Sequence, residues 1–198
     1  MKKIIQIAAT LALGLVLIAI NSCSPKKVTR VAPDKVIDLS GRWNETDARL
    51  CAESLISQAI GGDWLGNFSN QEKRKPVVVV GLVRNNSHEH IDTEIFIKDV
   101  EKAFLKSTLI RLVQAGEKRN ELRGERADQQ DFSSQESMKK FGKELGADFI
   151  MQGAVKSIVD GYGKEKTTFW QVDLELTNLE TNEIVWIGDY KGKKYIVN

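Results

Sequence analysis

The second half of the chain alternates between apolar and polar residues in the way that is typical of half-buried β-strands. The clearest stretch covers residues 167–177. From Trp170 onward its apolar positions are Trp170, Val172, Leu174 and Leu176, each separated from the next by one polar residue. Because successive side chains of a strand point to opposite faces, this period of two predicts one buried and one solvated face. We expect three strands here, over residues 149–159, 167–177 and 183–190, the last able to continue to Val197.

Two stretches nearer the N-terminus have the period of a helix instead. Residues 46–60 end at the stop signal Gly61, and their apolar face consists of Ala48, Cys51, Leu55 and Ala59. Residues 92–106 begin at the expected N-cap Asp92, and their expected buried face consists of Ile91, Ile95, Val100, Ala103 and Phe104. Two further helices are expected over residues 116–131, where Gly124 interrupts a strongly charged segment, and over residues 133–145, which open with a Ser133–Glu136 capping box.

The remaining segments predict how these elements are connected. Residues 77–83 form a nearly continuous apolar run, which is typical of a strand covered on both faces. Short strands are expected at 36–39 and 109–113, and loops at 61–75 and 84–90. Together these elements predict an α+β fold, with a mostly antiparallel sheet of four to five strands flanked by about four helices. Residues 37–198 would form this globular domain.

The N-terminal residues 1–22 have the pattern of a secretory signal, in which Lys2 and Lys3 precede an apolar run. Ser22 directly before Cys23, with Ile20 three positions before the cysteine, resembles a bacterial lipobox and implies cleavage after Ser22 and lipidation of Cys23. The alternative is an uncleaved membrane anchor, because the run approaches the length that spans a bilayer. Residues 23–36 would then be the lipidated cysteine and a short tether. Ser24 after the cysteine favours, by the same resemblance, an outer-membrane location.

The charge balance excludes a nucleic-acid-binding role. The 198 residues include 29 Lys and Arg and 27 Asp and Glu, for a net charge of +2. Lys2 and Lys3 in the signal account for that excess, so the processed chain is neutral. A neutral chain of mixed charges has no basic surface for a phosphate backbone. Cys51 has no partner left in the processed chain, and its place on an apolar helix face predicts a buried, inert thiol.

No segment has the pattern of a catalytic, metal or cofactor site. The two histidines, His88 and His90, lie two residues apart in a loop before Asp92, whereas the zinc-protease pattern needs four residues on a helix. We therefore expect no catalytic residue, no bound metal and no cofactor. Trp64 and Phe68 lie in the expected loop 61–75, which begins with a glycine-rich stretch. There they either close over the end of the expected helix 46–60 or act as surface anchors for a partner.

Five segments in the same order resemble one known family. They are residues 37–47 (IDLSGRWNETD), 76–93 (PVVVVGLVRNNSHEHIDT), 123–130 (RGERADQQ), 143–148 (KELGAD) and 171–183 (QVDLELTNLETNE). The chain resembles the LpoB family, the outer-membrane lipoprotein activators of penicillin-binding proteins, over most of its processed length. The resemblance implies a fold like the N-terminal domain of TolB.

The same resemblance implies a function without catalysis. Proteins of this family bind a bifunctional peptidoglycan synthase, a class A penicillin-binding protein, across the periplasm and stimulate it. This chain would therefore be a lipid-anchored, periplasmic, monomeric activator. An envelope scaffold or oligomerising assembly lipoprotein, with a TolB-like or curli-assembly-like domain, is the alternative. Our candidate interface consists of Arg84, Asn85, Asn86, Ser87, His88, Glu89 and His90, together with Trp64 and Phe68.

The tether departs from the family pattern. Enterobacterial members carry a much longer, proline-rich segment between the lipid and the domain, whereas here only residues 24–36 are available. Fully extended, they reach at most about 45 Å at roughly 3.5 Å per residue. Either the partner extends outward to meet the domain or the periplasm is narrower.

Overall fold

The computed structural model describes residues 28–132 and 146–197. The chain divides into two compact units, Met1–Lys35 and Val36–Asn198. The described part of the first unit, residues 28–35, contains one turn and neither helix nor strand. None of the described helices is long and apolar enough to cross a membrane.

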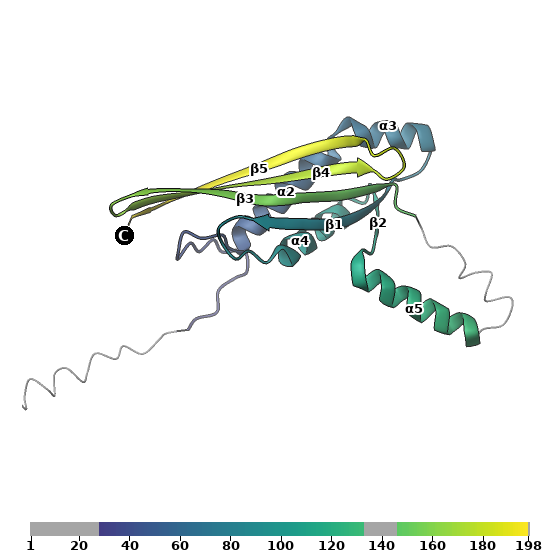
Figure 1. Ribbon diagram of the computed structural model, residues 1–198, viewed down its shortest axis with the longest axis horizontal. Coiled ribbons are helices and arrows are strands. Elements are labelled where there is room, and N and C mark those ends of the chain that lie inside the picture. Colours follow the sequence, from purple (N-terminus) through teal and green to yellow (C-terminus); the bar gives the residue numbers. More distant parts are fainter. Residues whose placement is uncertain (1–27, 133–145, 198) are drawn as a thin grey trace, which may run out of the picture. The chain divides into compact units, whose positions relative to one another are not determined.

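The second unit contains a five-stranded sheet with the strand order β2-β1-β3-β4-β5. The elements in chain order are α2 (Glu45–Ile60), α3 (Asp63–Glu72), β1 (Val77–Asn86), α4 (Thr93–Ser107), β2 (Arg111–Val113), α5 (Gly116–Phe132), β3 (Phe149–Tyr162), β4 (Glu165–Asn178) and β5 (Ile184–Val197). Figure 1 shows the three long strands β3, β4 and β5 side by side, with α2 and α4 across the sheet. The expected α+β class is therefore confirmed.

The sheet is mixed, which corrects the prediction of a mostly antiparallel one. β1 pairs in parallel with both β2 and β3, whereas β3–β4 and β4–β5 are antiparallel. The difference follows from the connections. α4 carries the chain back between β1 and β2, and a long segment including α5 carries it between β2 and β3, so those strands enter from the same end. Only the strands joined by short turns run antiparallel.

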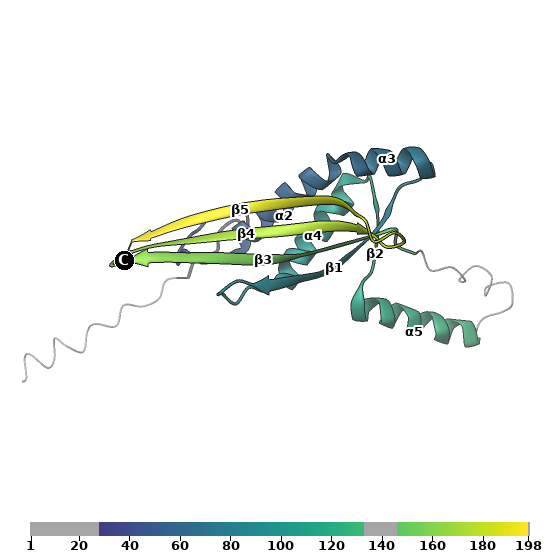
Figure 2. The ribbon, with the colours of Figure 1, turned by 45° about the horizontal axis from the view of Figure 1, so that its top comes forward.

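One face of the sheet is covered by α2 and α4 (Figure 2). α2 contacts α4 and β5, and α4 contacts β1 and β2. The expected alternation in β4 is confirmed, because Trp170, Val172, Leu174 and Leu176 are all buried. Burying each such side chain contributes roughly 1.5–3 kcal/mol to folding. The core therefore lies between this sheet face and the two helices.

The helix starts follow the capping chemistry of the sequence. The Asn44 side chain accepts hydrogen bonds from the backbone N–H groups of Thr46 and Asp47, while Asp47 accepts one from Asn44. Asp92 caps α4 as expected, by accepting a hydrogen bond from Glu94 N–H at 2.9 Å. In α4, however, Phe96 is fully buried while Ile95 is half exposed. Ile91, Val100 and Phe104 are buried as predicted, and Phe96 takes the place expected for Ile95.

Three further predictions are wrong. The expected loop 61–75 contains α3, and α5 runs through Gly124 without interruption. Residues 36–39 form no strand but lead into a bend. The expected helix over 133–145 lies outside the described residues.

Cys51 is fully buried in α2, as expected. Burial, aided by the nearby Asp47 charge, raises the pKa of the Cys51 thiol far above the usual range.

Asp148 joins the start of β3 to the start of β1. Its two carboxylate oxygens each accept a 2.7 Å hydrogen bond from Arg74, and Oδ2 also accepts one from the Val77 N–H at 2.8 Å. Burial disfavours the charged carboxylate, but the hydrogen bonds from Arg74 and Val77 outweigh it and hold the pKa of Asp148 below its usual range. The carboxylate is therefore stabilised in the folded state.

Replacing Asp148 by Ala should lower the free energy of unfolding by about 2 kcal/mol, because the buried Val77 N–H loses its side-chain acceptor and the bidentate ion pair is lost. A depressed folded-state pKa means that this contribution is complete above about pH 4 and is lost as the pH falls through the folded value. The difference measured by urea unfolding should therefore shrink below about pH 4. As a control, Asp99→Ala, which breaks a largely exposed pair with Lys102, should cost less than about 1 kcal/mol at neutral pH.

Residues 38–43 are fastened to β5 by Lys194; we call this segment the strap. The Lys194 ammonium contacts Asp38 Oδ1 at 2.7 Å, Asp47 Oδ2 at 2.6 Å and the Arg42 carbonyl at 3.0 Å. Burial lowers the pKa of Lys194, but the hydrogen bonds to Asp38 and Asp47 outweigh it, and the net shift is upward. A Cβ at Gly41 (φ +63°) would lie 2.4 Å from the Ile196 side chain, so the strap lies close against the end of β5.

Lys194→Gln should expose the peptide bond after Arg42 to trypsin, since the strap loses its ion pair through Asp38 and the ammonium hydrogen bond to the Arg42 carbonyl. We expect cleavage at least about tenfold faster than in the wild type, which corresponds to roughly 1.4 kcal/mol of easier local opening. N-terminal sequencing of the fragments identifies the bond. Lys193→Gln, which removes an exposed neighbouring charge, should cleave at the wild-type rate; equal rates in the two variants would contradict the role of Lys194.

Candidate partner-binding surface

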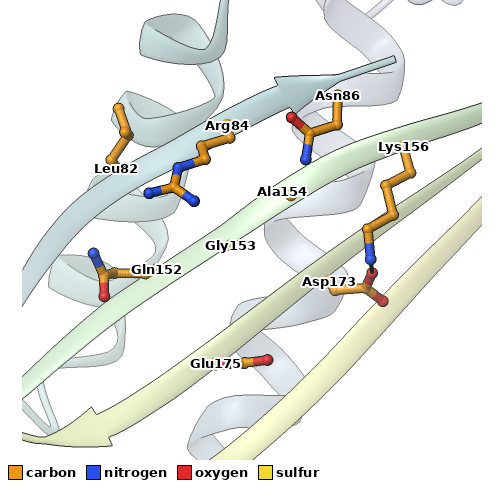
Figure 3. A pocket seen from close by; sticks show the side chains of 9 residues that line it. All are labelled: Leu82, Arg84, Asn86, Gln152, Gly153, Ala154, Lys156, Asp173 and Glu175. Atoms are coloured by element: carbon orange, nitrogen blue, oxygen red, sulfur yellow. Dashed lines mark hydrogen bonds and ion pairs between the residues drawn. The ribbon is translucent and has the colours of Figure 1, made fainter.

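The sheet face opposite α2 and α4 carries a polar surface that the strand register arranges in rows. Arg84, Ala154, Asp173 and Asp189 lie in one row across β1, β3, β4 and β5. The next row holds Asn86, Lys156, Gln171 and Lys191. Figure 3 shows Arg84, Asn86, Lys156 and Asp173 of these rows on the near side of the strands, with the helices behind. We call this the bare face.

A shallow hollow lies in the middle of the bare face. Small residues, Gly153 and Ala154, line its centre, and longer side chains surround them (Figure 3). The longer side chains are Leu82, Arg84, Asn86, Gln152, Lys156, Asp173 and Glu175. The short side chain of Ala154, surrounded by longer ones, therefore leaves a depression whose rim offers both hydrogen-bond donors and acceptors.

The charges of the hollow are only partly neutralised. Lys156 Nζ lies 2.9 Å from Asp173 Oδ2, and Gln171 Nε2 donates to Asp173 Oδ1 at 2.6 Å. Burial raises the pKa of Asp173, but these hydrogen bonds outweigh it and leave the pKa below its usual range. Arg84 and Glu175 form no ion pair with any described residue. A ligand of this hollow could therefore satisfy one unpaired cation and one unpaired anion.

The predicted interface loop 84–90 is in fact the end of β1 followed by a tight turn. Arg84 and Asn86 belong to β1 and lie on the bare face, whereas Asn85 has the opposite orientation and donates from Nδ2 to the Glu89 carbonyl at 2.8 Å. Ser87 bonds to Asn85 Oδ1 through both its N–H and its hydroxyl group. The sequence therefore predicted these residues as surface candidates, but it did not reveal that Asn85 and Ser87 build the turn.

His88 and Glu89 also hold the turn in place. The Ser157 hydroxyl lies 2.5 Å from His88 Nδ1, and Glu89 Oε2 accepts a hydrogen bond from Trp43 N–H at 2.9 Å. His88 and His90 remain exposed. Among residues 28–132 and 146–197, no group of three or more His, Cys, Asp or Glu is arranged to hold a metal ion.

Trp64 and Phe68 pack against Phe149 at the start of β3. Trp64 is buried and donates from Nε1 to the Ala59 carbonyl at 2.7 Å. The Phe68 ring is half-buried, and its centroid lies 5.2 Å from the centroid of the Phe149 ring. The Arg74 guanidinium lies 5.0 Å from the centroid of the Phe68 ring. The two aromatic residues thus close the core beside the end of α2, and both also line an open hollow together with Phe149.

The architecture is that of a small α+β domain in which, among the described elements, α2 and α4 cover one face of the sheet and the opposite face carries a polar hollow. A family model described as peptidoglycan-synthase activator LpoB matches residues 47–191, from the start of α2 into β5. The match covers well over half of the chain, and the chain belongs to the LpoB family. Comparison of the sequence with curated proteins gives no match.

Several solved structures are similar to this chain. The LpoB C-terminal domain from Escherichia coli is 16% identical, with a TM-score of 0.46, and the alignment covers 74% of this chain and 98% of that one. For the LpoB C-terminal domain from Salmonella enterica the values are 13%, 0.44, 74% and 98%. Lipoprotein GNA1162 from Neisseria meningitidis is 12% identical, with a TM-score of 0.38 and coverage of 61% and 83%.

Proposed function

We propose that this protein is a non-enzymatic outer-membrane lipoprotein that binds and stimulates a bifunctional peptidoglycan synthase, a class A penicillin-binding protein. The observation that carries the proposal is the family match, which runs from α2 into β5 and so includes β1 to β4 and the first part of β5. In this proposal Cys23 carries the lipid, residues 24–36 form the tether, and the domain lies in the periplasm. Neither a cofactor nor a metal is needed, because the protein acts by binding.

The bare face is our candidate for the docking surface. It is free of α2 and α4, and it carries the unpaired Arg84 beside a hollow. Backbone hydrogen bonds between the strands hold this surface rigid, so a partner meets a preformed surface. The domain therefore loses little conformational entropy on binding. The turn up to His90 directly follows Arg84 and Asn86, which line the hollow. The interface residues predicted from residues 84–90 are therefore continuous with the hollow.

Activation requires a difference in affinity between two states of the synthase. A ligand shifts an equilibrium only by as much as its free energies of binding to the two states differ. A surface containing an unpaired cation and an unpaired anion suits this role, because it discriminates between arrangements of partner charges. The domain would therefore bind the active arrangement of the synthase more tightly than the inactive one.

Direct activation is measured with the purified, processed protein, a class A synthase from the same organism and lipid II. We expect faster formation of glycan strands when the protein is added. If no synthase of the organism is bound or stimulated, the proposal is wrong, and a scaffolding role in the envelope would take its place.

Arg84→Glu should weaken binding to the synthase by at least about tenfold, or roughly 1.4 kcal/mol, because it replaces an unpaired cation at the hollow by an anion. Surface plasmon resonance with immobilised synthase measures the change. Lys102→Glu is the matched charge reversal, on an exposed side chain of α4 behind the sheet, and it should bind like the wild type. A loss of binding that is equal in both variants would remove the bare face from the interface.

Replacing both His88 and His90 by Ala should reduce stimulation while shifting the melting temperature by only a few degrees, since both side chains are exposed. The measurements are glycan-strand formation and thermal unfolding on the same preparations. A folded double variant with full activity would exclude this turn from the interface.

A further inference from the structure

Apolar and aromatic side chains are exposed together where β3, β4 and β5 reach their common end. Tyr162 is 94% exposed, Ile158 66%, Val197 64% and Tyr195 61%. Figures 1 and 2 show this end of the sheet projecting past α2 and α4, with the C-terminus beside the β3–β4 turn. No residue from Ile158 to Lys166 is buried. These side chains are therefore not part of the core.

The strand register places these side chains on one face. Ile158 pairs with Phe169 and Lys193, Asp160 with Thr167 and Tyr195, and Tyr162 with Glu165 and Val197. Since directly opposed residues point to the same side of a sheet, three successive rows each contribute an apolar or aromatic group. We call the set Ile158, Tyr162, Phe169, Tyr195 and Val197 the tip patch.

The tether enters the domain at the same end of the sheet, on the face opposite the tip patch, because Lys194 and Ile196 alternate with Tyr195 and Val197 along β5. The strap is fixed to Lys194 through Asp38 at 2.7 Å, and residues 38–41 line a shallow groove together with Lys194, Tyr195, Ile196 and Val197. Leu39 in the strap is 92% exposed and adds a further apolar side chain here. Cys23 is thus joined to Asp38, at the end of the sheet that carries the tip patch, by fifteen residues of chain, which reach at most about 52 Å at roughly 3.5 Å per residue.

We propose that the tip patch contacts the surface of the lipid bilayer that holds the Cys23 anchor. This inference rests on the lipidation stated under Proposed function. The composition of the patch suits the interfacial layer, because tyrosine rings have an apolar body and a polar hydroxyl, and are enriched at that depth. Lys164 in the turn and Lys193 on β5 can extend their ammonium groups into water while their stems stay among the apolar side chains.

The charges around the patch argue for apolar rather than electrostatic attraction. Asp160 and Glu165 balance Lys164 and Lys193 in the same three rows and turn. Attachment to the membrane therefore does not depend on anionic lipid. A covalent anchor raises the local concentration of the patch at the bilayer, so even a contact too weak for an unanchored domain is populated. The contact would leave α3 and the β4–β5 turn, at the other end of the sheet, directed away from the membrane (Figure 1).

The test measures fluorescence quenching in the chain from Cys23 to Asn198, anchored in vesicles of phosphatidylethanolamine and phosphatidylglycerol. Coupling Cys23 to a maleimide lipid supplies the anchor whether or not the cell lipidates this residue, and the buried Cys51 does not compete. Failure of natural lipidation, detected by mass spectrometry, is thus distinguished from failure of the membrane contact. Tyr162→Trp reports on the tip, and Leu179→Trp, 47% exposed in the β4–β5 turn, is the matched control.

Lipids brominated near the head of the acyl chains should quench the added emission of Tyr162→Trp by at least about twofold and leave that of Leu179→Trp nearly unchanged, since interfacial side chains lie at that depth. The quenching should persist without phosphatidylglycerol. Equal quenching of the two variants would overturn the proposal. So would an unquenched Tyr162→Trp whose emission shifts to the blue as the protein density on the vesicle rises, because the patch would then bind a second copy.

Discussion

The packing of α2 and α4 on one face of the sheet determines the rest of this structure. α2 and α4 bury the alternate side chains of β4 against the matching rows of β1 and β3, and the core lies in that single layer. Because alternation fixes which side chains are buried, it also fixes which ones remain outside. The bare face, with Arg84 and the hollow at its centre, and the tip patch farther along the same strands are consequences of this arrangement.

Much of the fold could be predicted because local chemistry and tertiary packing agree. The period of two in β4 and the capping residues Asn44 and Asp92 each specify a structure by themselves. α3 could not be predicted, because Gly66 and several Asn and Ser residues are poor helix formers; packing of Trp64 and Phe68 on Phe149 stabilises it instead. The parallel pairing of β1 also depends on long-range connections, which no local pattern encodes.

The candidate surface was predictable only in part, for a related reason. Arg84 and Asn86 are polar and follow an apolar run, so they look like the start of a loop. In the structure the pairing of β1 with β3 continues as far as Asn86 and Lys156. This pairing places Arg84 and Asn86 of β1 on the bare face. The residues that line the hollow beside Arg84 come from β3 and β4, far along the chain. Only the strand register brings them close to Arg84. Family membership supports the proposed function, and the register indicates the place where we expect it.

The most direct test of this account is photo-crosslinking in living cells with a photoreactive amino acid at single positions. At Gln152, in the hollow of the bare face, the account predicts a crosslink to a class A synthase. At Glu53, exposed on α2 on the other side of the sheet, it predicts none. A synthase crosslink from Glu53 and none from Gln152 would contradict docking through the bare face, and no synthase crosslink from any exposed position would contradict the proposed function itself.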